Sequence, residues 1–78
     1  MTSQQMIEYL GRQCQSAGQE LERTVRQGNP DAIAAKHLET KFHMEFLKGY
    51  ATAMEHAGLM EKAQADEFFA AVGQIGAR

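Results

Sequence analysis

The chain lacks the disulfides and structural zinc sites that usually stabilise a small domain. Among its 78 residues there is one cysteine, Cys14, and one proline, Pro30. A single cysteine excludes an internal disulfide, and no Cys/His spacing typical of structural zinc is present. Folding at this length hides only about 60% of the surface that the unfolded chain exposes. We therefore expect a single domain in a reducing compartment, stabilised by association between chains.

Long apolar runs and an excess of positive charge are also missing. No run approaches the roughly 20 apolar residues that a membrane-spanning helix requires. The opening MTSQQMIEYL lacks the basic and apolar parts of a signal peptide, so we expect a cytoplasmic protein with no membrane partner. The formal net charge is -2, with both signs interspersed. Because nucleic-acid-binding proteins concentrate Lys and Arg on one face, nucleic acid is not favoured as a partner.

What the sequence does contain is a set of helix start and stop signals. TSQQ near the start is typical of a capping box. In QGNPDA, Gly28 suits a left-handed helix end, Asn29 can cap the next helix and Pro30 fits its first position. Gly58 in HAGLM marks a second break. We predict an all-α domain, with helices over about 3–27, 31–57 and 60–72 and a frayed tail over 73–78.

The first predicted helix has one narrow apolar seam. Its members recur at alternating spacings of three and four residues, which calls for one partner helix. They are Ile7, Leu10, Cys14, Ala17 and Leu21. Burial in this seam raises the pKa of a thiol and makes it inert, so Cys14 is interpreted as a core residue rather than a nucleophile.

Two glycines edge this seam and leave two interpretations open. Gly11 and Gly18 each cost up to about 1 kcal/mol relative to alanine in a helix interior. They could permit close approach of a second helix, with Phe42 or Phe46 against the notch. They could equally be tolerated weak points.

The second predicted helix is apolar over more than half its circumference, at roughly 100 degrees per residue. A helix of this kind needs at least two neighbours. One flank comprises Leu38, Phe42, Phe46, Tyr50 and Ala53. The other flank comprises Ile33, Met44, Leu47, Ala51 and Met54. The expected solvent strip comprises Lys41, Glu45, Lys48, Thr52 and Glu55.

Helix lengths indicate which part of this helix is left uncovered. The first two helices are both near 40 Å at 1.5 Å per residue, so a short loop makes them a matched antiparallel hairpin. The third helix is about half as long and covers only the later half of the second, leaving Leu38 and Phe42 beyond it. We therefore expect a homodimer formed through the second helix, with a core like a four-helix or six-helix bundle.

This arrangement predicts a non-enzymatic protein-interaction module, an accessory, chaperone-like or inhibitory protein acting through an apolar helical groove. The predicted contact residues are Leu38, Phe42, His43, Phe46 and Tyr50. Phe68 and Phe69 would close the core behind them. No catalytic residue, cofactor or metal is predicted, because neither paired carboxylates in an apolar pocket nor a glycine-rich phosphate loop is apparent.

Two alternatives stay open. Glu39 and His43 stand four residues apart on one helical face, a spacing that suits one divalent ion. Two ligands are too few, so a metal site would need a third ligand from another helix or another subunit, and two copies across a homodimer would supply four. The other alternative is a DNA-associated transcriptional regulator, although the long helices carry mixed charge instead of a basic recognition helix.

Overall fold

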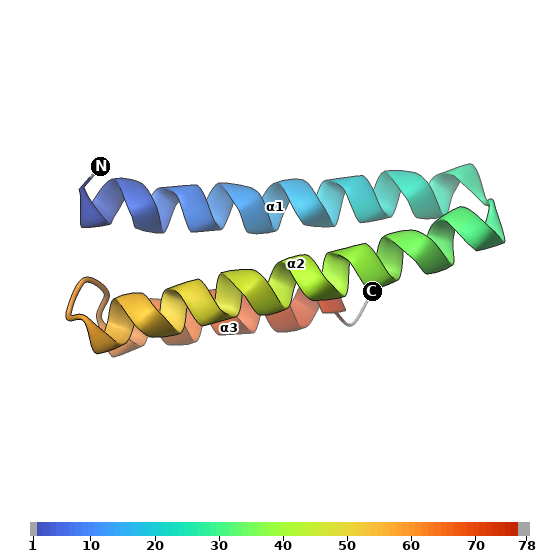
Figure 1. The fold of residues 1–78 in the computed structure, drawn as a ribbon. Coiled ribbons are helices and arrows are strands. Elements are labelled where there is room, and N and C mark those ends of the chain that lie inside the picture. The colour runs from blue at the N-terminus through green and yellow to red at the C-terminus, as the bar shows by residue number, and fades with distance from the viewer. Residues whose placement is uncertain (1, 77–78) are drawn as a thin grey trace.

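The protein is built from three α-helices. The computed structural model describes residues 2–76, and all the regular structure in that range is helical. The helices are α1 (Ser3–Gln27), α2 (Pro30–His56) and α3 (Lys62–Gly76). The chain turns after α1 so that α2 runs back beside it, and α3 returns along the later half of α2 (Figure 1). The molecule is a rod measuring 43 × 17 × 15 Å.

The predicted start and stop signals act as expected. The Thr2 hydroxyl accepts a hydrogen bond from the backbone N–H of Gln5 at 3.2 Å, and the Gln5 side chain accepts one from the Thr2 N–H at 2.9 Å. The Asn29 side chain accepts from the first two free N–H groups of α2, and Gly28 has φ 76°. The capping box and the turn between α1 and α2 are therefore confirmed.

Helix α3 differs from the prediction at both ends. It begins at Lys62 rather than near residue 60, and it continues to Gly76, so residues 73–76 are helical where fraying was expected. The extension is stabilised by burial, because Val72 and Ile75 are only 7% and 6% exposed. Residues 77 and 78 of the expected tail lie outside the described residues.

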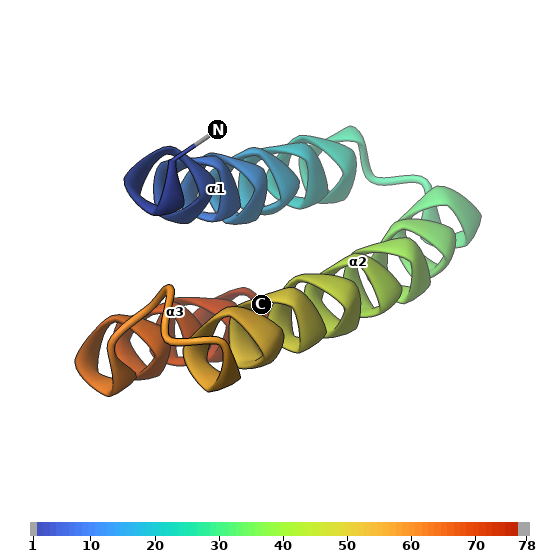
Figure 2. The same cartoon turned by 60° about the vertical axis from the view of Figure 1, so that its left-hand side comes forward.

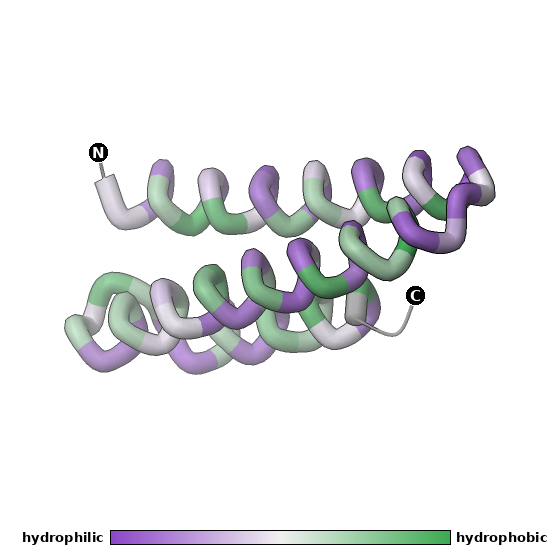
Figure 3. Tube along the Cα trace, turned by 45° about the vertical axis from the view of Figure 1, so that its right-hand side comes forward, coloured by the Kyte–Doolittle hydropathy of each residue, from purple (hydrophilic) through white to green (hydrophobic). Residues whose placement is uncertain are grey.

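The core follows the seam of α1 and one flank of α2. Leu10, Leu21 and Leu47 are fully buried. Along α1, hydrophobic segments recur on the edge that faces the other helices (Figure 3). Phe68 and Phe69 are half-buried and pack against this core, with ring centroids 6.2 Å apart.

Helix α2 is the central element, because it packs against both of the others. Figure 2 shows α2 and α3 side by side, with α1 on another side of α2. The buried α2 residues are Thr40, Met44, Leu47, Ala51 and Met54. These residues take up the contacts with α1 and α3 and leave the rest of the α2 circumference to solvent.

Glycine substitutions test this packing. A Cβ atom at Gly11 would meet no atom within 4 Å, so Gly11→Ala should raise the free energy of unfolding by about 0.5–1 kcal/mol through helix propensity. The matched control, Gly28→Ala, should lower it by about 1 kcal/mol because a side chain is strained at φ 76°. Urea denaturation at one protein concentration measures both. Destabilisation by Gly11→Ala would show that a second backbone approaches α1 at this point.

Candidate interaction surface

Four large apolar side chains stand exposed in a row on α2. Leu38 is 55% exposed, Phe42 64%, Phe46 66% and Tyr50 41%. A spacing of four residues places them on one face of the helix, and we refer to them as the α2 stripe. The rings of Phe46 and Tyr50 lie 6.4 Å apart at an interplanar angle of 42°, a separation typical of interacting aromatic pairs.

The stripe is exposed because of the side on which α3 packs. Val72 and Ile75 of α3 line one groove together with Met44 of α2, so α3 covers the flank that contains Met44. Phe46 and Tyr50 stay exposed even though α3 runs along this half of α2. The uncovered surface therefore extends beyond Leu38 and Phe42 to Phe46 and Tyr50, which the length of the third helix did not predict. The reason is that α3 covers the flank that contains Met44.

The exposed apolar area is large for so small a chain. At about 200 Å² per aromatic side chain, the exposed fractions of Phe42, Phe46 and Tyr50 correspond to roughly 350 Å². Contiguous apolar patches of a few hundred Å² on a monomer are often functional. The other large exposed apolar residues are scattered: Tyr9, Val25 and Leu59 lie on α1 and on the segment before α3. Only on α2 do such residues form a continuous surface.

The fifth predicted contact residue, His43, lies on a different side of α2. It is half-buried, one turn from the buried Leu47 and two turns from Lys36, which pairs with Glu20 of α1. The structure thus brings Leu38, Phe42, Phe46 and Tyr50 together and places His43 toward α1. A role for His43 in contact with a second chain stays a prediction.

An ion-pair network crosses from α1 to α2 near His43. The Lys36 ammonium donates to Glu20 at 3.0 Å and to Glu39 at 3.3 Å. Its hydrogen bond and its charge lower the pKa of Glu20. The hydrogen bond to Glu20 likewise raises the pKa of Lys36, although partial desolvation acts in the opposite direction. The network pins α1 to the first half of α2, where α3 does not reach.

Other chemistry has little support within one chain. Across residues 2–76, no three side chains of the His, Cys, Asp and Glu types gather where they could hold a metal ion. Glu39, the proposed partner of His43, is engaged by Lys36. Cys14 is 4% exposed within the core. A metal site shared between two chains stays a prediction.

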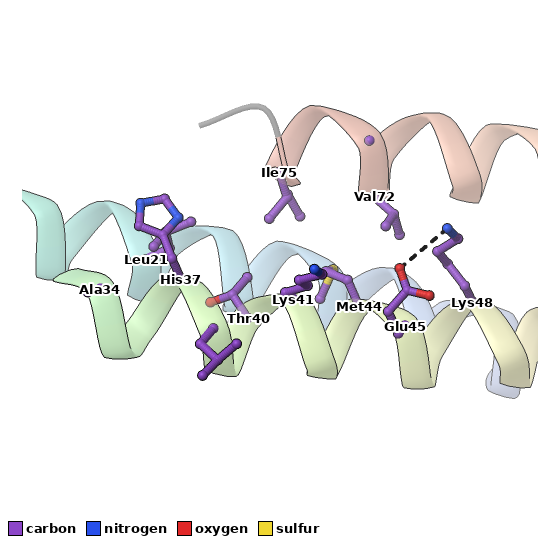
Figure 4. Close-up of a pocket in the computed structure, with 12 residues that line it drawn as sticks. Leu21, Ala34, His37, Thr40, Lys41, Met44, Glu45, Lys48, Val72 and Ile75 are labelled. Carbon is purple, nitrogen blue, oxygen red and sulfur yellow. Dashed lines mark ion pairs between the residues drawn. The ribbon is translucent and has the colours of Figure 1, made fainter. Parts of the chain in front are cut away.

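A groove that the sequence did not reveal lies on the α3 side of α2. It has a volume of about 600 Å³. In Figure 4, Val72 and Ile75 of α3 face Thr40 and Met44 across it, and the Glu45–Lys48 ion pair lies to one side. The Lys48 ammonium and the Glu45 carboxylate are 3.6 Å apart. The short third helix indicated that part of α2 would be uncovered. Which residues line the groove depends on how α3 packs against α2.

Comparison with other proteins adds no assignment. No protein-family model, curated protein or solved structure matches this chain. Among residues 2–76, every helix is too short or too polar to cross a lipid bilayer. The inference of function therefore rests on the α2 stripe and its surroundings.

The Glu20–Lys36 pair gives a pH-dependent test of the described geometry. Because the folded-state pKa of Glu20 lies below the ordinary value of 4.5, the pair stabilises the fold above that pH and this contribution is lost as the pH falls through the lowered pKa. Glu20→Gln should therefore lose less unfolding free energy than the parent between about pH 6 and about pH 3. Glu67→Gln on α3 is the control and should follow the parent. Identical pH profiles for Glu20→Gln and the parent would contradict the pairing.

Proposed function

We propose that this protein is a non-enzymatic, cytoplasmic protein-interaction module that acts as a homodimer. Its protomer is the antiparallel hairpin of α1 and α2 with α3 packed on one side, and the α2 stripe is the contact surface. One observation carries the proposal. The apolar residues of the flank around Leu47 are buried within the chain, whereas Phe42 and Phe46, on the other flank, are about two-thirds exposed.

The exposed area is on the scale that a small dimer interface requires. The accessible surface is 5308 Å², whereas a compact monomer of 8.7 kDa is expected to expose about 4700 Å². The excess of roughly 600 Å² equals the area per partner at the lower end of specific interfaces. Burying each aromatic side chain of the stripe fully would contribute about 1.5–3 kcal/mol, which offsets part of the entropy lost on association.

Pairing through the stripe would also give this short chain a complete helical bundle, formed from two copies. Lys36 of α2 pairs with Glu20 of α1, so two copies joined through α2 would place four long helices together. Helix α3 then lies outside this bundle. The groove lined by Val72 and Ile75 lies beside the stripe and shares Leu38 with it. A homodimer of this form suits an accessory, chaperone-like or inhibitory role.

A charge placed in the stripe tests the proposal. Phe42→Glu should convert the dimer to a monomer, because the contact would bury a carboxylate against apolar rings without a partner. The matched control is Ala70→Glu, which adds the same charge at an exposed position of α3 and should leave the dimer intact. Light scattering after size-exclusion chromatography measures the mass.

Circular dichroism of the same samples separates dissociation from unfolding. If Phe42→Glu unfolds the chain, the milder Phe46→Ser serves as the second variant and should weaken the dimer while the helices persist. A folded Phe42→Glu variant with the parent's mass would show that the stripe is not the contact surface.

A further inference from the structure

Three residues of the α2 stripe, Leu38, Phe42 and Phe46, belong to a longer exposed line that runs the full length of α2. Every position on this line is exposed, and each spacing is three or four residues, so the line stays on one face. In chain order the positions are Asp31, Ala35, Leu38, Phe42, Phe46, Gly49, Ala53 and His56. An interaction surface of this length exceeds the four residues of the stripe itself.

The residues along this line pair about a common centre, Ala with Ala and Phe with Phe as like residues, and Leu with Gly as residues of complementary size. The centre of the line lies between Phe42 and Phe46, at the level of Met44 along the helix axis. Ala35 and Ala53 each lie nine residues from Met44, whereas bulky Leu38 lies six residues before it and Gly49, which has no side chain, lies five residues after it. The outermost positions carry an acid, Asp31, in the first turn of α2 and an imidazole, His56, in the last turn.

We propose that a second copy of the chain packs against this line. The two α2 helices are then antiparallel and related by a two-fold axis that crosses the line between Phe42 and Phe46. This rests on the proposed homodimer and specifies its orientation and register. Phe42 then faces Phe46 of the partner subunit, and Asp31 faces His56 of the partner subunit. Leu38 fills the space above Gly49 of the partner subunit, where an added Cβ would meet nothing within 4 Å in the single chain.

Complementarity of side-chain size selects this orientation. A two-fold interface requires a surface that complements itself after rotation, and on this line Phe42 meets Phe46, Ala35 meets Ala53 and Leu38 meets Gly49. Antiparallel helices also bring opposite macrodipole ends together. A parallel pair would instead set Asp31 against its own copy, and Gly49 against its own copy with a gap between them. An unrelated partner protein would not require any symmetry along the line.

Cysteine cross-linking tests the register. In a Cys14→Ala background, Leu38→Cys and Gly49→Cys are prepared as separate chains of different mass and treated with dibromobimane, which joins only closely spaced thiols. The antiparallel register predicts a cross-linked dimer in the mixture and none in either chain alone. Thr52→Cys, off the line on α2, is the control and should not cross-link with Leu38→Cys.

The outcomes separate the register from the homodimer itself. Cross-linking of either variant alone indicates parallel helices, and failure to cross-link in mixtures that sediment as dimers indicates another register or surface. Either result overturns this inference and leaves the homodimer standing. A Cys14→Ala parent that sediments only as a monomer overturns both.

A charge exchange provides a second measurement if the cysteine variants dissociate. Asp31→Lys should weaken the dimer several-fold, and adding His56→Glu should restore it. Each substitution opposes the macrodipole of its own helix, so recovery in the double variant arises only from pairing between chains. Additive weakening would overturn the register.

Discussion

Helix α2 carries more apolar surface than one chain can cover, and the rest of the structure depends on how that surface is divided. Met44, Leu47, Ala51 and Met54 are buried against α1 and α3. The opposite flank, centred on Phe42, is largely exposed within the described chain. Since apolar burial is the main favourable term in folding, the stability of the protomer and the proposed association of two copies would have the same physical origin.

Polar interactions position the helices but contribute little stability by themselves. The ion pairs are solvent-exposed at one partner or both, and pairs of this kind are typically worth no more than about 1 kcal/mol. Their value lies in placement. Lys36 connects α1 to α2 beyond the reach of α3, and the Asn29 cap fixes where α2 begins. These contacts hold the two long helices in register while their apolar seams pack.

The sequence predicts local features well and the choice among tertiary contacts poorly. Caps at Thr2 and Asn29 and the seam through Leu10 follow from spacing and short-range hydrogen bonding, which are local properties. Periodicity also separates the two flanks of α2. It does not indicate which flank α3 covers, because both are apolar and of similar width. The helical extension to Ile75 and the groove beside Met44 depend on that choice and therefore could not be predicted from the sequence.

Sedimentation equilibrium of the unmodified chain over a range of concentrations tests the central claim most directly. If the uncovered flank of α2 is a contact surface for a second copy, the fitted mass should approach twice 8.7 kDa as the concentration rises. It should fall toward 8.7 kDa on dilution. A well-folded particle that stays at 8.7 kDa throughout would contradict the account.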